Sequence, residues 1–467
     1  MSKLMPDYYE RTSIKLWPNG DFDPQGLFGE VQAKSLELKQ IVSNMVIFES
    51  LLDHSIRATI DVLDANNILE DLRIEGDEYI TIEFKKDTPE GKSKYKIRLM
   101  VTDIKNYVRP SVGAQTYRLE CSSEHDYLNQ LTILDRKFEG NIGKLVSDIV
   151  KKDLRVSKDH IGTINTKTAK LIKGIYPQLR PVNAVKWLTR NAFENSTPFF
   201  FYESIESEEL NKKPAFNKIN FTSLDALSKN PVVAKFERKP YNTGQMLDEK
   251  DDIRREQILS VSVPQVRSTF EDLQNGAYGS TITHLDISTK TLVTNAEHKH
   301  DGKFVILENK FTDDSGEIGR NPFSDAHNKF LDKKITDFPY AKRFYSSQNS
   351  LSFDGFDNYH APVVENIRKA AQKISGMEIS KLVIDIYGDP RLTVGSKIDV
   401  KIGKALHPDE LETNKVVDES VSGVYIIYDI IHTLTADQKW TSQLNLRKDS
   451  SNLDYNSKIT KIKDKSV

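Results

Sequence analysis

The sequence predicts a mainly β protein of the α+β class, built from two antiparallel barrel-like or sandwich-like modules and a small mixed α/β domain. Two long segments, one near each end of the chain, alternate apolar and polar residues as strands with one buried face do. Between them the apolar residues change to helical spacing. With 467 residues, the chain is also too long for one ordinary core, so about two to four domains are expected.

The first module is predicted from EYITIEF (78–84) and KYKIRLMV (94–101), whose apolar residues occupy every second position. The segment between them, KKDTPEGKSK, supplies a turn. We therefore expect a long hairpin with one dry face, formed by Ile80, Ile82, Phe84, Tyr95, Ile97, Leu99 and Val101.

The mixed domain is predicted from two helical patterns. NIGKLVSDIVKKDL follows a candidate N-cap at Asn141, and NAVKWLTRNAF repeats the helical spacing before Pro198. The next stretch, STPFFFYES, places three phenylalanines and a tyrosine side by side. We expect Phe199 to Tyr202 to form the central strand of this domain, covered on both faces with helices on one side; the alternative is an exposed patch for a partner.

The second module is predicted from the closing third of the chain. KLVIDIYGDPRLTVGSKIDVKIG indicates two strands around a turn, and GVYIIYDIIHTLTADQKWTSQLNLRKDS indicates a hairpin turning at 436–439. This register places Leu444 and Leu446 on one face. The opposite, outward face carries Thr441, Gln443 and Asn445. Before these strands, VVENIRKAAQKI predicts a helix with one apolar side that includes Ile374.

These patterns divide the chain into successive regions. The expected divisions are an extended N-terminal arm at 1–30 that is ordered only against something else, a first module at 31–125 completed by about 216–245, the mixed domain at 126–215, the start of the second module at 246–295, a polar insertion or small domain at 296–360, the helix and closing strands of the second module at 361–450, and a flexible tail at 451–467.

Charge and composition exclude several classes of protein. The 66 basic residues nearly balance the 68 acidic ones, so we expect no stable binding of nucleic acid and no attraction to an anionic membrane. Cys121 is the sole cysteine, which excludes an intramolecular disulfide and a thiolate-rich metal site. We expect no secretory signal, because the first residues lack its organisation, and no membrane span.

Motifs for chemistry are absent from the pattern of residues. The pair His298 and His300 lacks further ligands, and 311–319 lacks the spacing of a calcium loop. Cys121 has only His125 near it in sequence and is typical of a buried small residue. Pairs such as Asp385 and Asp389 are common in a chain of this charge. We therefore predict no catalytic, cofactor-binding or metal residues, no cofactor, and a protein that is not an enzyme.

Several segments together resemble the central baseplate hub protein of contractile-tailed bacteriophages, a family related to the hub part of type VI secretion spikes. NMVIFESLLDHSIRATIDVLDANNILEDLRIEGDEYITIEF is similar to its opening, RPVNAVKWLTRNAFENSTPFFFYES and FTSLDAL to its middle, and LQNGAYGSTITHLDISTKT to a later piece. GDPRLTVGSKIDVKI and SGVYIIYDIIHTLTADQKWTSQLNLRKDS resemble its closing strands. The residues that carry the match are Glu49, Asp61 or Asp64, Glu70, Gly76, Glu78, Gly276, Tyr278, Gly279, Ser280, Asp286 and Lys290.

The resemblance implies two barrels of the tail-tube type and a structural role in the virion. A homotrimer would present six similar modules, and would join a sixfold tail tube or tube-initiator protein above to a threefold cell-puncturing spike below, among other baseplate proteins. Assembly would take place in the host bacterial cytoplasm, and DNA would pass through the channel. Two alternatives are a tail-associated enzyme that processes cell-wall glycans, which needs a pair of carboxylates in a cleft, and a tail adhesin or carbohydrate-binding protein. The scattered Trp17, Trp187 and Trp440 do not indicate the aromatic platforms of an adhesin.

Overall fold

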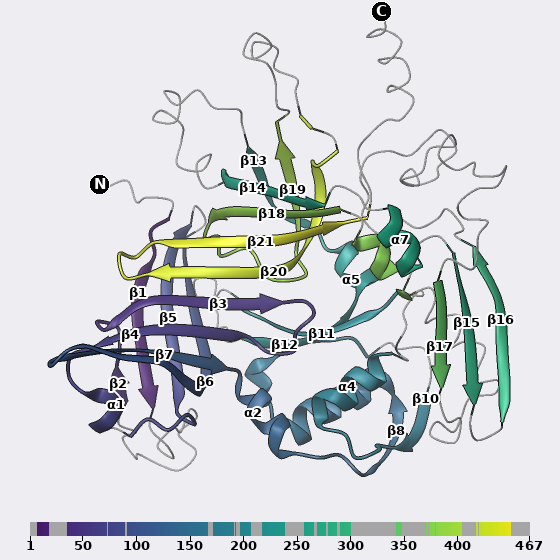
Figure 1. Cartoon of the computed structure of the whole chain (residues 1–467), viewed down its shortest axis with the longest axis horizontal. Helices are drawn as coiled ribbons and strands as arrows, with labels where there is room; N and C mark the ends of the chain where they lie inside the picture. Colours follow the sequence, from purple (N-terminus) through teal and green to yellow (C-terminus); the bar gives the residue numbers. More distant parts are fainter. Residues whose placement is uncertain are drawn as a thin grey trace, which may run out of the picture.

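A computed structural model of the chain shows a mainly antiparallel β fold, as expected (Figure 1). Most strands belong to one 13-stranded sheet, and three small sheets lie beside it. The residues that the structure describes are 7–17, 35–71, 73–88, 91–166, 171–190, 192, 197–206, 217–238, 256–265, 269–276, 279–286, 290–299, 342–347, 370–371, 373–378, 380–403, 417–418 and 420–449.

The first barrel occupies the left of Figure 1. Its strands follow the spatial order β3–β4–β7–β6–β5–β1, and its core contains the expected hairpin residues, with Ile82 opposite Ile97 and Phe84 opposite Tyr95. The strand bounds are β1 (Glu10–Trp17), β3 (Val42–Ser50), β4 (Arg57–Asp64), β5 (Tyr79–Thr88), β6 (Gly91–Ser111) and β7 (Ala114–Ser122).

The first barrel closes where β1 meets β3. The short strand β2 (Leu36–Glu37) pairs with β1 and leads into β3. Arg11 of β1 donates a hydrogen bond from Nη1 to the carbonyl oxygen of Val42, over 2.8 Å. The helix α1 (Ile68–Asp71) lies between β4 and β5 in the chain. The dry face predicted for this module is therefore the inside of a barrel.

The second barrel is a ring of six strands in the order β14–β18–β21–β20–β19–β13. A parallel bridge between Glu237 and Gln257 joins β13 to β14 and closes the ring. Leu444 and Leu446 point into its core, while Gln443 is exposed on the outside, as the sequence predicted. The strand bounds are β13 (Val232–Arg238), β14 (Ile258–Gln265), β18 (Ser380–Tyr387), β19 (Lys397–Ile402), β20 (Gly423–Thr435) and β21 (Trp440–Lys448).

The two barrels are joined by β20, which takes part in both. Its first half pairs with β19, from Gly423 to Ile426. Its second half, from Asp429 to Thr435, pairs antiparallel with β3 of the first barrel. The two barrels therefore share one continuous sheet, and each encloses its own apolar core.

The two barrels also share one strand order. We number the six strands of each barrel from first to sixth in chain order. In both barrels, their order around the ring is then first, second, third, sixth, fifth and fourth. The four ladders that link the second to the third, the third to the sixth, the sixth to the fifth and the fifth to the fourth strand are antiparallel in both. One difference is the first strand, since β1 runs antiparallel to β5 whereas β13 runs parallel to β19.

Irregularities of the ladders recur at equivalent places. The register between β3 and β4 shifts between Val42 and Asn44, and that between β14 and β18 shifts between Ile258 and Ser260. In the fifth strands, the shift lies between Val101 and Asp103 in β6 and between Ile427 and Asp429 in β20. Bulges at matching positions align the two barrels residue by residue around these bulges. Farther along, β14 and β6 have register shifts after Ser262 and after Lys105 that β3 and β20 lack.

The mixed α/β domain lies below the second barrel in Figure 1. As predicted, the Asn141 side chain caps α3 by accepting from the backbone N of Lys144, and apolar residues of α3 and α4 fill the core. The elements are α2 (Glu124–Leu131), β8 (Lys137–Asn141), α3 (Ile142–Asp148), a π-helix (Ile149–Asp153), a 3₁₀ turn (Lys158–His160), β9 (Ile161–Ile164), β10 (Leu171–Ile175), α4 (Pro181–Thr189), β11 (Phe199–Ser204), β12 (Lys218–Ser223) and α5 (Leu224–Lys229).

Three expected regions differ from the structure. Glu10–Trp17 of the expected arm is β1, a strand ordered against β5 of the same chain. The described part of 216–245 does not complete the first barrel, because β12 pairs within the mixed domain and β13 pairs with β19. Periodicity cannot identify a partner, since an apolar strand fits either neighbour equally well.

The start of the second module is also corrected. Of 246–295, the described strand β14 joins the second barrel, whereas β15 (Gly279–Asp286) and β16 (Thr291–Lys299) form a separate sheet with β17 (Lys342–Ser347). The helix α7 (Thr269–Asn275) precedes that sheet. The expected helix at 363–374 is described from 370 onward, and Ile374 is 40% exposed rather than on a buried side. The segments 239–255 and 300–341 and the expected tail at 451–467 lie outside the described residues.

Within the described part of the chain, no helix is long and apolar enough to cross a membrane.

Candidate functional site

The aromatic strand β11 lies where the mixed domain meets the second barrel. Phe199 and Phe201 point into the core of the mixed domain, where the Phe199 ring stacks on Phe221 at 4.8 Å between centroids. Phe200 and Tyr202 point the other way, into the core of the second barrel. This strand has no face in contact with water, as predicted, and can therefore carry four adjacent aromatic residues.

The expected position of this strand in its sheet was wrong. The order is β11–β12–β9, so β12 is central and β11 is at the edge. Helices of the mixed domain cover one face of β11, and the second barrel covers the other. The burial of both faces of β11 could be predicted from the strand itself. That the second barrel covers one of them could not, because the strands of this barrel are about 180 to 250 positions away in the chain.

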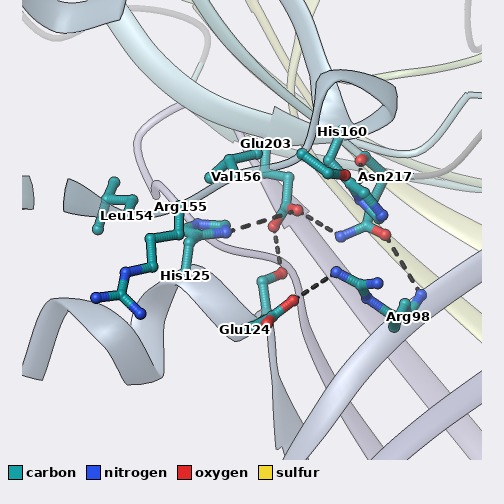
Figure 2. A pocket seen from close by; sticks show the side chains of 11 residues that line it. Arg98, Glu124, His125, Leu154, Arg155, Val156, His160, Glu203 and Asn217 are labelled. Carbon is teal, nitrogen blue, oxygen red and sulfur yellow. Dashed lines mark hydrogen bonds and ion pairs between the residues drawn. The ribbon is translucent and has the colours of Figure 1, made fainter. Parts of the chain in front are cut away.

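Glu203, the residue before the last of this strand, accepts hydrogen bonds from three other parts of the chain. Its carboxylate accepts from the backbone N of Ile56 at 2.8 Å and from the side chains of Ser123 and Asn217 (Figure 2). Glu203 is 2% exposed. Three donors compensate the loss of water around this buried carboxylate. Glu203 therefore fixes the mixed domain to the start of β4 and to α2.

A second buried carboxylate, Glu49 of β3, joins both barrels to the mixed domain. Its Oε1 lies 2.9 Å from Nε2 of His432 in β20, and its Oε2 accepts from the backbone N of Ile205 at 2.8 Å. The indole N–H of Trp440 donates to His432 Nδ1 over 3.2 Å. Because an indole nitrogen only donates, His432 carries its proton on Nε2 and donates it to Glu49.

A small cavity lies beside Glu203. Its volume is about 20 Å³, enough for about one water molecule. Arg98, Glu124, His125 and His160 are among the residues of its wall (Figure 2). Glu124 is bound by the Arg98 guanidinium and by the Tyr79 hydroxyl at 2.9 Å. The cavity is too small for a sugar or a peptide, so this arrangement supports packing between elements.

Burial and neighbouring charges shift the titration of three groups near this junction. Burial, with a smaller contribution from the Arg98 charge, lowers the pKa of His160 to about 4. The hydrogen bond from His54 lowers the pKa of Asp126 to about 2. Burial opposes ionisation of His54, but its bonds to Asp126 and Asp53 outweigh this and raise its pKa. His160 is thus held neutral, whereas the contact of His54 with Asp126 favours the charged forms of both groups.

The candidate chemical residues of the sequence do not form one site. Cys121 is buried in β7, and burial raises the pKa of its thiol far above the usual range. His125 Nε2 bonds the carbonyl oxygen of His54 at 2.8 Å. Asp385 accepts from Gln443 at 2.9 Å, while Asp389 binds Arg391. Among the described residues, no three His, Cys, Asp or Glu side chains come together as a metal site.

The candidate calcium loop at 311–319 and His300 lie outside the described residues. His298 is in β16, paired with Ser280. No sequence signal of catalysis identified Glu49, Glu203 or His432, although Glu49 was among the residues that carried the family resemblance. The charge of Glu203 at the end of a fully apolar run is the one signal that could have indicated a buried polar contact.

The residues that carried the family resemblance have structural roles in the described part of the chain. Asp64 is buried and accepts from the backbone N atoms of Asn66 and Ile68 at the start of α1. Glu78 accepts from Glu75 and Gly76, and Gly76 has a φ of +108°, a region that glycine adopts without strain. Of the others in this set, Asp61 binds Arg118 and Glu70 binds Arg109. Gly279, Ser280 and Asp286 lie in β15, and Lys290 follows it.

Comparisons with known proteins found similarity of structure alone. No protein-family model matches the chain, and no curated protein matches it. The chain is similar to a tail protein from Neisseria meningitidis MC58, with 10% identity, a TM-score of 0.48, and coverage of 95% of this chain and 97% of that one. It is similar to a 43 kDa tail protein of prophage MuSo2 from Shewanella oneidensis, with 11% identity, a TM-score of 0.48, and coverage of 95% and 99%.

A third solved structure is an Escherichia coli component of the type VI secretion system, with 8% identity and a TM-score of 0.41; the match covers 89% of this chain and 75% of that one. Structural neighbours of the chain thus include two tail proteins, one of them from a prophage, and a type VI secretion component. At this level of similarity no residue role carries over to this chain.

Proposed function

We propose that this protein is a structural hub of a contractile phage tail, a homotrimer that joins a sixfold tail tube to a threefold spike. The observation that carries the proposal is the shared strand order of the two barrels, including the matching bulges. Three copies of a chain with two equivalent barrels contribute six equivalent modules, while the rest of the chain is present three times. Such an assembly matches sixfold symmetry on one side and threefold symmetry on the other.

The buried junction supports a structural role. The carboxylates of Glu49 and Glu203 bind donors from separate elements and hold the barrels and the mixed domain together. Buried charges of this kind cost free energy unless fully bonded, and they favour one arrangement of domains over others. A hub that transmits force between a tube and a spike requires such fixed geometry.

The outer face of the second barrel suits a hydrated channel. Gln443 bonds Asp385 and Asn445 bonds Asp429 at 3.1 Å on this face. Because the polar groups bond each other, a passing polymer would find few unpaired groups to hold. We propose that this face lines the channel, through which DNA passes without stable binding, in the tail baseplate of a virion assembled in the bacterial cytoplasm.

The test of the proposed function is the mass of the assembly. Light scattering is measured over a range of protein concentrations, for the chain alone and after co-expression with the spike protein of the same particle. The proposal expects a particle of three chains, alone or with the spike. A monomer under both conditions, or clearing of a cell-wall zymogram by the purified chain, contradicts it.

A further inference from the structure

The contact between the two barrels within the chain indicates where a second chain binds. In this contact, the second half of a fifth strand, β20, pairs antiparallel with a second strand, β3. The equivalent fifth strand of the first barrel is β6, and the equivalent second strand of the second barrel is β14. One chain therefore contains one complete contact of this kind and the two separate halves of another.

Both halves present an unpaired edge in the described part of the chain. From Thr102 to Ser111, β6 pairs with β7 on one side, and no described strand lies on the other. The edge of β14 opposite β18 carries the single bridge from Gln257 to Glu237 and no described ladder beyond it. Unpaired edges expose backbone donors and acceptors that a further strand can bind.

Exposed apolar side chains accompany these edges. Tyr107 and Val108 of β6 are 43% and 55% exposed, and Leu259 of β14 is 39% exposed. At the contact inside the chain, the backbone edges of the corresponding strands β3 and β20 are paired with each other. An apolar edge left in water favours association with a matching edge.

We propose that β6 of one copy pairs antiparallel with β14 of the next copy, repeating between chains the pairing of β20 with β3. This inference rests on the proposed trimer and names its interface. The contact joins two different surfaces, one from each of two neighbouring barrels. It closes into a ring when the rotation from one barrel to the next is a whole fraction of a full turn. Three chains then form a ring of six barrels with no unpaired edge at these positions.

The contact inside the chain also supplies the register. Ile431 lies opposite Phe48. Lys105 corresponds to Ile431, because it stands two residues after the shared bulge, at Asp103 and Asp429. Gln265 corresponds to Phe48, because β14 has a further bulge between Ser262 and Gln265, and Gln265 and Phe48 face the equivalent residues Lys381 and Arg57. Pro264 has no N–H, which removes one ladder bond and is tolerated at an edge.

Cysteine cross-linking tests this pairing. The variants are K105C/Q265C and K105C/P264C, which cover two neighbouring registers, with the buried Cys121 left in place. A disulfide needs Cα atoms within about 4.4–6.8 Å. It cannot form within one chain, because β18, β21, β20, β3, β4 and β7 lie between β14 and β6 in the sheet. The control is K94C/Q265C, since Lys94 lies in the part of β6 that already pairs with β5.

Oxidation of either variant is expected to give a covalent trimer that reduction dissolves, while the control and the single variants give none. If light scattering shows a trimer but neither variant cross-links, the edge pairing is wrong and the proposed trimer remains. A ladder of products longer than three chains contradicts a closed ring. A monomer without cross-links contradicts both the pairing and the trimer.

Discussion

Glu49 and His432 lie 383 residues apart in the chain, yet Oε1 of the first and Nε2 of the second are 2.9 Å apart. The pair crosses the ladder between β3 and β20, which joins the two barrels. Glu49 also accepts from the backbone of Ile205, so one carboxylate contacts all three units. We expect Glu49→Ala to destabilise the protein by about 3 kcal/mol, because both donors lose their partner.

The control for this variant is Asp437→Ala, which removes an exposed carboxylate from the turn between β20 and β21. Denaturant unfolding should show little change for this control, because solvent screens an exposed carboxylate. Equal effects of the two substitutions would contradict the role given to Glu49.

Truncation of the aromatic strand should affect two cores. Phe199→Ala and Phe200→Ala are each expected to cost about 3 to 5 kcal/mol as buried cavities, one in the mixed domain and one in the second barrel. The control is Phe270→Ala, since Phe270 is 80% exposed. Thermal melts, together with a pull-down of a partner protein, distinguish a role of the strand in the core from a role as a docking patch. Unchanged melting with lost binding would show that the strand is a binding surface instead.

Close packing at one glycine gives a sharper test of the junction between the barrels, because Gly388 follows β18 of the second barrel and the Trp440 ring packs in the core of the first. A Cβ atom at Gly388 would lie 2.0 Å from the Trp440 ring, whereas a Cβ at Gly113 would meet no atom within 4 Å. We expect Gly388→Ala to destabilise by about 3 kcal/mol through overpacking and Gly113→Ala to have little effect. Chemical denaturation measures both, and a neutral Gly388→Ala would show that Trp440 is less constrained than described.

The buried His160 predicts a dependence of stability on pH. Its pKa is lowered to about 4 in the folded state, against 6.5 in an unperturbed histidine. Between these values the unfolded chain binds the proton and the folded chain does not, so stability from this group is present above about pH 6.5 and is lost as the pH falls toward 4.

The slope from one proton is at most about 1.4 kcal/mol per pH unit. The free energy of unfolding is measured from pH 4 to 7 for the wild type and for His160→Gln. The difference between the two curves should decrease by this slope as the pH falls, since the variant has no proton to gain. A constant difference would mean that His160 titrates alike in both states.

The fold class and the local elements could be predicted because they depend on nearby residues. The hairpin of β5 and β6, the Asn141 cap and the turn after β20 each follow from spacing and turn residues within about 30 positions. The double burial of Phe199 to Tyr202 followed from the absence of polar alternation.

Long-range pairing could not be predicted in the same way. The pairing of β13 with β19, of β1 with β5, and the separate sheet of β15 to β17 depend on which apolar edges meet in space. The junction formed by Glu49, Glu203 and His432 escaped prediction for the same reason, because its donors come from distant strands. The equivalence of the barrels became visible once the ladders and their bulges were known.

The central claim is that two equivalent barrels per chain build a sixfold ring from three copies. Electron microscopy of the purified assembly, with end-on views averaged without imposed symmetry, tests it most directly. We predict six similar densities around an open centre, with threefold modulation from the mixed domains. A solid axis, or densities for the two barrels that differ in shape and in distance from the axis, would contradict it.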